Sequence, residues 1–153
     1  MITYIHGDLF TTPDTVIVHG CNAAGVMGSG VAKTIKEKYP KAFQDYHKFC
    51  TAGYKLEEVM GRNIFSEQPD GKIIVNSITQ PSYGRAFGIR FCSYDAIDDC
   101  MQRLFMECEE RGIISISMPK IGAGLGGGSW DVIEKIIEQH FLGSGINVNV
   151  YFL

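Results

Sequence analysis

Two glycine-rich segments constrain the fold of this chain more than any other feature of its sequence. The first, residues 20–30, follows the apolar, β-branched run 15–19, and the second, residues 122–128, follows the run 113–119. Glycine lets backbone N–H groups approach a ligand closely, and the start of a following helix adds unpaired donors and a partial positive charge. One such segment can bind an anion, and two can hold a diphosphate from both sides. The sequence therefore predicts a binder of a phosphorylated nucleotide.

The order of the predicted elements specifies an α/β fold. We expect strands at residues 2–5, 15–19, 58–65, 72–78, 113–118 and 148–153, helices at residues 31–39, 41–51, 92–111 and 130–141, and a loop at residues 81–89. Strands interleaved with helices form a mixed, largely parallel sheet that is covered on both faces. Ligands bind such sheets at the carboxyl ends of the strands, which is where both glycine-rich segments fall. A length of 153 residues predicts one domain spanning residues 1–153.

Composition argues against several classes of protein. The net charge of −3 argues against general nucleic-acid binding, which depends on neutralising phosphates. No segment approaches the roughly 20 apolar residues that cross a membrane, and the N-terminus lacks the pattern of a signal peptide. The five cysteines form no C-x-x-C pair, so we expect reduced thiols in a cytoplasmic protein. No spacing of His, Cys, Asp and Glu predicts a metal site, and we expect no cofactor.

Two common nucleotide-binding motifs are only partly matched. The second segment fits G-x-G-x-x-G through Gly122, Gly124 and Gly127. The next predicted strand, 148–153, does not end in the acid that binds a ribose in a dinucleotide-binding unit. The first segment has glycines at the spacing of a phosphate-binding P-loop, but Val31 stands where a lysine must reach the phosphates. Neither motif explains the chain.

Three further motifs occur in order along nearly the whole chain. They are Gly7-Asp8-Leu9, then Cys21-Asn22-Ala23-Ala24 leading into Gly28-Ser29-Gly30-Val31-Ala32, then Met118-Pro119-Lys120-Ile121-Gly122-Ala123-Gly124-Leu125 followed by Trp130. With these motifs the sequence resembles the macro domain family, and within it the branch of ADP-ribose-1″-phosphate phosphatases and terminal ADP-ribose glycohydrolases. The resemblance implies a three-layer α/β/α fold with a six- to seven-stranded mixed sheet. It also implies a cleft for ADP-ribose or a derivative, with ADP-ribosylated macromolecules as a further class of partner.

The resemblance also implies which residues bind the ligand. Asp8 would accept a hydrogen bond from the adenine amino group, although a carboxylate here is also typical of a turn or cap. Tyr151 would pack near the adenine, with a plain core aromatic as the alternative. The two glycine-rich segments would enclose the diphosphate and the distal ribose. The ligand-binding residues expected on this basis are Asp8, Leu9, Asn22, Ala23, Gly28, Ser29, Gly30, Val31, Thr79, Gln80, Pro119, Ile121, Gly122, Ala123, Gly124, Leu125, Gly126 and Tyr151.

The chain departs from its implied branch at the catalytic positions. The glycohydrolases carry a Lys after the Ile-Thr of the middle strand and an Asp after the Gly-x-Gly-Leu of the second loop. This chain has Gln80 and Gly126 there, and neither side chain can act as a nucleophile, acid or base. His19 is the candidate that remains, because imidazole titrates near neutrality. A structural histidine at the end of a strand is the alternative. Because Gly20 begins the first glycine-rich segment, we expect His19 at the edge of the sheet rather than in its middle.

Asn22 is the second catalytic candidate, because its amide can hydrogen-bond ribose hydroxyls. The alternative is a turn residue that tolerates unusual backbone angles. Beyond ligand binding, three functions compete: an ADP-ribose-1″-phosphate phosphatase, a non-catalytic ADP-ribose reader or sequestering module, and an ADP-ribosyl ester glycohydrolase without the Lys and Asp pair.

Overall fold

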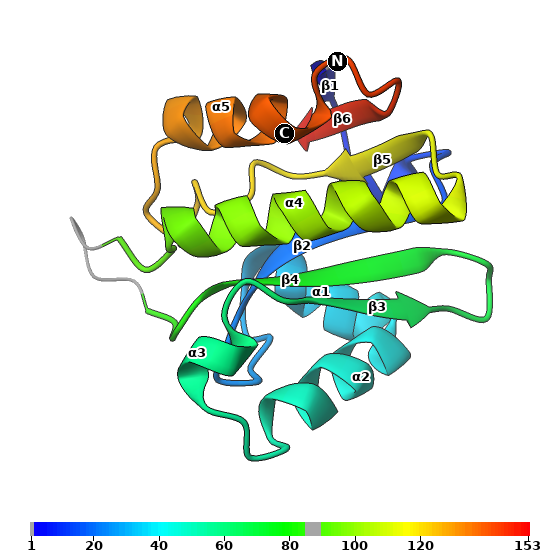
Figure 1. The fold of residues 1–153 in the computed structure, drawn as a ribbon. Helices are drawn as coiled ribbons and strands as arrows, with labels where there is room; N and C mark the ends of the chain where they lie inside the picture. The colour runs from blue at the N-terminus through cyan, green and yellow to red at the C-terminus, as the bar shows by residue number, and fades with distance from the viewer. Residues whose placement is uncertain (1, 85–89) are drawn as a thin grey trace.

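The computed structural model describes residues 2–84 and 90–153, so the end of the predicted loop at 81–89 lies outside the described residues. The elements in chain order are β1 (Ile2–His6), a 3₁₀ turn (Leu9–Thr11), β2 (Val16–Asn22), α1 (Gly30–Lys38), α2 (Pro40–Cys50), α3 (Leu56–Val59), β3 (Asn63–Glu67), β4 (Ile73–Gln80), α4 (Tyr94–Arg111), β5 (Ser115–Met118), α5 (Trp130–Phe141) and β6 (Asn147–Phe152). A six-stranded mixed sheet lies between two helical layers (Figure 1). The predicted α/β class with a covered mixed sheet is confirmed.

The central position of β2 in the sheet brings the two glycine-rich segments together. The strand order is β1-β6-β5-β2-β4-β3, and every pair is parallel except β3 with β4. Because β5, β2 and β4 are parallel neighbours, the segments that follow them leave the same edge of the sheet. That edge is where a ligand site is expected in such a fold.

Alternation along β2 sends side chains into two separate cores. Val16 and Val18 pack with the apolar faces of α4 and α5, whereas Ile17 packs with α1 and α2. The sheet is therefore covered by α4 and α5 on one face and by α1 and α2 on the other (Figure 1). Over the described parts of the chain, no helix is both long enough and apolar enough to cross a membrane.

The strand predicted at residues 58–65 differs from the structure over residues 58–62, which are not part of a strand. Leu56–Val59 forms the short helix α3, and β3 begins only at Asn63. The Lys55 backbone N–H donates to Glu58 Oε1 (3.4 Å), and leucine and glutamate are strong helix formers. Gly61 then has a φ of 80°, which an extended strand does not contain. The prediction of a strand is therefore wrong for the first part of this segment.

β2 is longer than predicted, since it runs to Asn22 rather than ending at His19. A Cβ placed on Gly20 would lie 3.1 Å from Ile121 Cγ2 and 3.2 Å from Thr79 Oγ1, so this glycine serves close packing within a strand. His19 consequently lies inside the sheet and is 1% exposed. Our expectation that it stands at the edge of the sheet is wrong.

The start of α4 is tied to the end of β4. The Ser93 backbone N–H donates to the Thr79 carbonyl (2.7 Å), and Ser93 Oγ accepts from the Ala96 N–H (3.1 Å) as the N-cap. At its other end α4 stops at Gly112, whose φ of 69° is left-handed. Both ends of the helix are thus fixed by local chemistry.

We predict that Ser93→Ala lowers the free energy of unfolding by about 1 kcal/mol, because the Ala96 N–H loses its acceptor. Ser129→Ala is the matched control, since Ser129 is the N-cap of α5 but, over the residues that the structure describes, its side chain makes no cap hydrogen bond. Denaturant titration of both variants measures the difference. Equal stability of the two variants would contradict the assigned cap.

Candidate functional site

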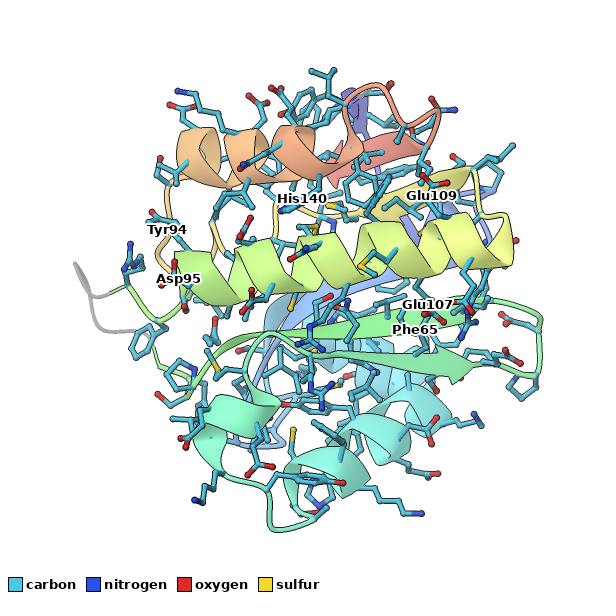
Figure 2. The ribbon with its side chains drawn as sticks, in the orientation of Figure 1. Phe65, Tyr94, Asp95, Glu107, Glu109 and His140 are labelled. Carbon is cyan, nitrogen blue, oxygen red and sulfur yellow. The ribbon has the colours of Figure 1, made fainter. Side chains whose placement is uncertain are left out.

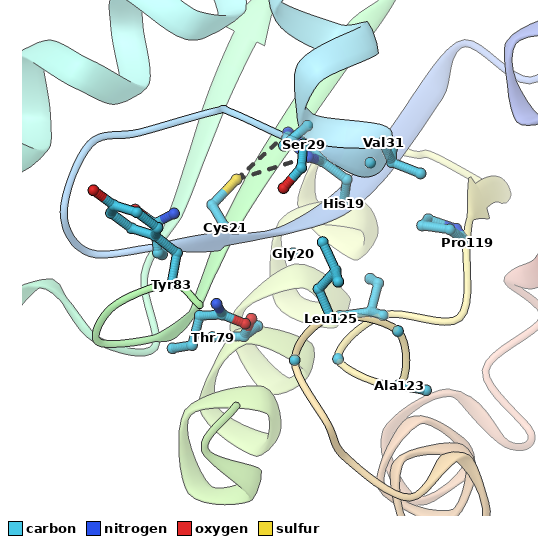
Figure 3. Close-up of a pocket in the computed structure, with 18 of the residues that line it drawn as sticks. His19, Gly20, Cys21, Ser29, Val31, Thr79, Tyr83, Pro119, Ala123 and Leu125 are labelled. Atoms are coloured by element: carbon cyan, nitrogen blue, oxygen red, sulfur yellow. Dashed lines mark hydrogen bonds between the residues drawn. The ribbon is translucent and has the colours of Figure 1, made fainter. Parts of the chain in front are cut away.

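A cavity of about 740 Å³ lies at the edge of the sheet where β2, β4 and β5 end. Its volume falls in the range typical of sites for small molecules. Three segments form its wall: the first loop with the start of α1, the end of β4 with the residues after it, and the second loop. Figure 3 shows Ser29 and Val31 on one side of this space and Ala123 and Leu125 on the other.

Most of the residues expected to bind the ligand belong to the wall of this cavity. They are Asn22, Gly28, Ser29, Gly30, Val31, Thr79, Gln80, Pro119, Ile121, Gly122, Ala123, Gly124, Leu125 and Gly126. The catalytic candidate His19 belongs to the wall as well. Four others lie outside the wall: Asp8, Leu9, Ala23 and Tyr151. The wall also contains residues that the sequence analysis did not select, namely Gly20, Cys21, Val26, Ala32, Tyr83, Gly84 and Lys120. Isolated apolar residues in loops, such as Val26 and Tyr83, have neither a periodic spacing nor a chemical group that would identify them in the sequence as residues of a binding site.

Asn22 holds the first loop through its side chain. Asn22 Oδ1 accepts from the N–H groups of Ala24 (3.1 Å) and Val26 (3.3 Å), and Nδ2 donates to the Val26 carbonyl (2.8 Å). The Tyr46 hydroxyl donates to Asn22 Oδ1 (2.8 Å) from α2. Asn22 is 8% exposed and is the last residue of β2, and no described residue other than glycine has a positive φ. Its side chain thus orders the loop, but without the unusual backbone angles of the alternative. Its role toward a ribose stays a prediction.

The sequence analysis missed the helix that supports this loop. Besides Tyr46, His47 on α2 places Nδ1 3.0 Å from the Gly25 carbonyl oxygen. Gly25 has a φ of 80°, and a Cβ there would lie 3.2 Å from His47 Nδ1, so only glycine fits this contact easily. The sequence predicts only a helix at residues 41–51, and helical periodicity contains no signal for a contact with a distant loop.

Backbone N–H groups line the cavity from two sides. On the first side α1 begins at Gly30, and the first N–H groups of a helix have no partner within it. On the second side, the N–H groups of Gly124, Leu125 and Gly126 meet no acceptor among the described residues. Such groups attract an anion, and the dipole of α1 adds to that attraction.

The two positions at which the chain departs from the glycohydrolases lie against each other. A Cβ placed on Gly126 would lie 3.1 Å from Gln80 Oε1 and 2.7 Å from the carbonyl oxygen of Gly122. The φ of Gly126 is not left-handed, so crowding rather than backbone conformation excludes a side chain there. Gln80 and Gly126 therefore lie side by side in the wall. Neither side chain supplies the amine or the carboxylate that the resemblance to the glycohydrolases would lead one to expect there.

His19 belongs to the wall but is almost fully buried, and it is hydrogen-bonded to the neighbouring strand. His19 Nε2 lies 2.6 Å from Asn76 Oδ1. Asn76 Nδ2 donates to the carbonyls of Ala42 and Ile64 (3.2 Å each), so Oδ1 is the acceptor and His19 Nε2 carries the proton. Burial lowers the pKa of His19 to about 4, although the bond to Asn76 opposes this shift. The imidazole is therefore neutral at pH 7. A neutral, buried imidazole fits a structural histidine better than a catalytic residue that donates a proton.

The remaining ionisable groups of the wall are also poorly suited to acid–base chemistry. Burial raises the pKa of Cys21 well above its ordinary value, and the thiol lies 3.5 Å from His19 Nε2. A protonated, buried thiol is a poor nucleophile. Among the described wall residues, Lys120 carries the one full charge, and its Nζ lies 5.5 Å from the centroid of the Phe152 ring.

Asp8 lies outside the cavity wall and is exposed. Asp8 Oδ1 accepts from the Phe10 N–H (2.9 Å). One carboxylate oxygen therefore caps the 3₁₀ turn, as the alternative interpretation of Asp8 expects. The Gly7 N–H donates to the Phe152 carbonyl (2.8 Å), and Phe152 is 38% exposed. Tyr151 is 8% exposed and belongs to the core that contains Leu9, which matches the alternative of a core aromatic.

Comparison with known proteins identifies the family. The family model described as the macro domain matches residues 18–137, and the chain belongs to that family. Its relatives include an ADP-ribose 1″-phosphate phosphatase of Candida albicans, which is 27% identical over 100% of both chains. They also include a DNA ADP-ribosyl glycohydrolase of Mycobacterium tuberculosis, which is 32% identical over 92% of this chain but only 39% of that protein.

The solved structures agree with the fold. A protein of unknown function from Bacteroides thetaiotaomicron has a TM-score of 0.88 to this chain at 28% identity, with 100% of this chain and 98% of that one covered. The macrodomain of Mycobacterium tuberculosis DarG has a TM-score of 0.85, also at 28% identity, covering 99% and 97%. The family resemblance inferred from the sequence motifs is confirmed.

We predict that Gly126→Ala lowers the free energy of unfolding by about 1–3 kcal/mol, because the new Cβ must displace the backbone at Gly122. Gly124→Ala is the matched control in the same loop, since a Cβ there meets nothing within 4 Å among the described residues. It should change stability by no more than about 0.5 kcal/mol. Thermal and denaturant unfolding measure both, and equal losses would show that the crowding at Gly126 is misassigned.

We predict that burial of neutral His19 makes stability depend on pH. The unfolded chain binds a proton as the pH falls through 6.5, whereas the folded protein does so only near the lowered pKa of about 4. The contribution is therefore complete above pH 6.5 and is lost between pH 6.5 and about 4, by on the order of 3 kcal/mol. His19→Gln should lose this part of the pH dependence, whereas His6→Gln should keep it. Denaturant titration across pH 4–7 tests this, and identical pH profiles for wild type and His19→Gln would refute it.

Proposed function

We propose that this chain binds ADP-ribose or a close derivative in the cavity between its two glycine-rich loops. The observation that carries the proposal is the pair of N–H sets that line opposite sides of the cavity, from the start of α1 and from Gly124 to Gly126. A diphosphate between them would accept hydrogen bonds from both loops, beside the positive end of the α1 dipole. The macro domain family and the names of the relatives point to the same class of ligand.

In this proposal the two ends of the ligand meet different chemistry. The adenine lies toward Asp8, whose carboxylate is exposed and has a second oxygen for the exocyclic amino group. The Phe152 ring, which is 38% exposed, would offer an apolar surface for the adenine on the strand next to β1. The distal ribose lies toward the end of β4, where Thr79 and Gln80 belong to the wall.

Phosphate release from ADP-ribose 1″-phosphate is the second candidate function. It is favoured by the match to the Candida albicans phosphatase, which extends over the whole of both chains. In this role the unprotonated Nδ1 of His19 would act as the base toward water. A base with a pKa of about 4 is weak at neutral pH, so we expect slow turnover. A non-catalytic reader would use the same cavity without this step, and ester hydrolysis would have to use Asn22 and loop backbone rather than the Lys and Asp pair.

We predict that calorimetry detects ADP-ribose binding and that AMP and NAD bind more weakly. Asp8→Ala should weaken ADP-ribose binding by about 1–3 kcal/mol, because the adenine amino group loses its acceptor. Glu109→Ala is the control, since Glu109 lies at the other end of α4 from Tyr94 and far from the second loop (Figure 2). Absence of binding by the wild type at millimolar ligand would refute the proposal.

Catalysis is tested separately from binding. The protein is incubated with ADP-ribose 1″-phosphate, with ADP-ribosylated protein and with ADP-ribosylated DNA, and the released phosphate or ADP-ribose is measured. Phosphate release that His19→Gln abolishes, with ADP-ribose affinity retained, supports the phosphatase. Binding without release of either product supports the reader.

A further inference from the structure

Gln80 lies between the two glycine-rich loops, since its main chain is hydrogen-bonded to the first and its side chain lies beside Gly126 of the second. Its backbone carbonyl accepts from the Ala23 N–H of the first loop (2.8 Å). Its side-chain Oε1 faces the second loop, at 3.1 Å from the point that a Cβ of Gly126 would occupy. The residue is therefore placed to fix one loop relative to the other.

The orientation of the Gln80 side chain is set by a hydrogen bond of its own. Gln80 Nε2 donates to the Ser82 carbonyl (2.7 Å), which directs Oε1 toward Gly126. Gly126 is held from its other side, because its carbonyl accepts from the N–H groups of Phe91 (2.8 Å) and Cys92 (3.0 Å) ahead of α4. The second loop thus lies between a main-chain anchor and the Gln80 amide.

We propose that Gln80 is a positioning residue that holds the second loop at the distance from the first loop that the ligand requires. It acts through Gly126, next to the N–H groups of Gly124 and Leu125, and it takes no part in bond breaking. The consequence for binding rests on the proposed function, since it concerns the diphosphate and distal ribose of ADP-ribose. The consequence for the loop does not, because the contact exists without any ligand.

Gln80→Ala tests the proposal in the loop itself, by hydrogen exchange of the protein without ligand. Exchange should accelerate at least about threefold in peptides covering residues 122–128, because the loop opens more readily when one side is unsupported. The Ala23 amide should keep its protection, since it is bonded to the Gln80 main chain, which the substitution retains. Gln102→Ala, at an exposed position of α4, is the matched control and should change neither segment.

The second measurement compares two ligands by calorimetry. ADP-ribose contains the whole group that the loops enclose, whereas AMP lacks the second phosphate and the distal ribose. Gln80→Ala should weaken ADP-ribose binding about tenfold and AMP binding less than about twofold, with the melting temperature nearly unchanged. A residue that only supports the fold would weaken both ligands together with the melting temperature.

The outcomes separate the two proposals. Unchanged exchange at 122–128 in Gln80→Ala overturns the positioning role, whatever the wild type binds. An equal loss for both ligands also overturns it. If the wild type binds no ADP-ribose but exchange at 122–128 accelerates as expected, the ligand assignment fails and the contact between Gln80 and the second loop stands.

Discussion

The carbonyl group of Gly122 is the point on which the second loop depends. It accepts from the Gly128 N–H (2.8 Å), which closes the loop on itself. A Cβ on Gly126 or Gly128 would lie 2.7 Å or 2.9 Å from the same oxygen. A loop wound this tightly around one backbone oxygen has no room for a side chain at Gly126 or Gly128. Gly124, Leu125 and Gly126 belong to the cavity wall, and their N–H groups meet no acceptor among the described residues.

The first loop reaches a similar form by a different route. Here the side chains of Asn22, Tyr46 and His47 satisfy and orient the backbone between residues 22 and 26. Side-chain hydrogen bonds can be removed one at a time, whereas crowding around a backbone oxygen cannot be relieved without moving the chain. The two loops therefore differ in how they are held, although their glycine content makes them look alike in the sequence.

The sequence predicted the parts of the molecule that depend on local patterns. Alternation in β2, the apolar faces of α4 and α5 and the glycine-rich segments at strand ends gave the fold and most of the cavity wall. The strand predicted at residue 58 was wrong because a four-residue helix with a left-handed glycine after it is too short for periodicity to detect. His19 was placed at an edge because Gly20 looked like the start of a loop, when its missing Cβ instead allows Ile121 to approach the strand. The contacts of Gln80 with two loops join segments far apart in the chain, and no local pattern contains them.

Apart from Lys120, the described wall of the cavity presents uncharged side chains and backbone dipoles. His19 is neutral, Cys21 is a protonated thiol, and Gln80 and Gly126 carry no charge. Fixed N–H dipoles can stabilise a diphosphate without the desolvation cost of burying lysine or arginine. They cannot, however, donate or remove a proton near pH 7, which hydrolysis of a glycosidic or phosphate ester bond requires from some group. Since Lys120 is the one charged residue of the described wall, we infer that the site favours binding of an anion, and that any proton transfer would fall to the weakly basic His19.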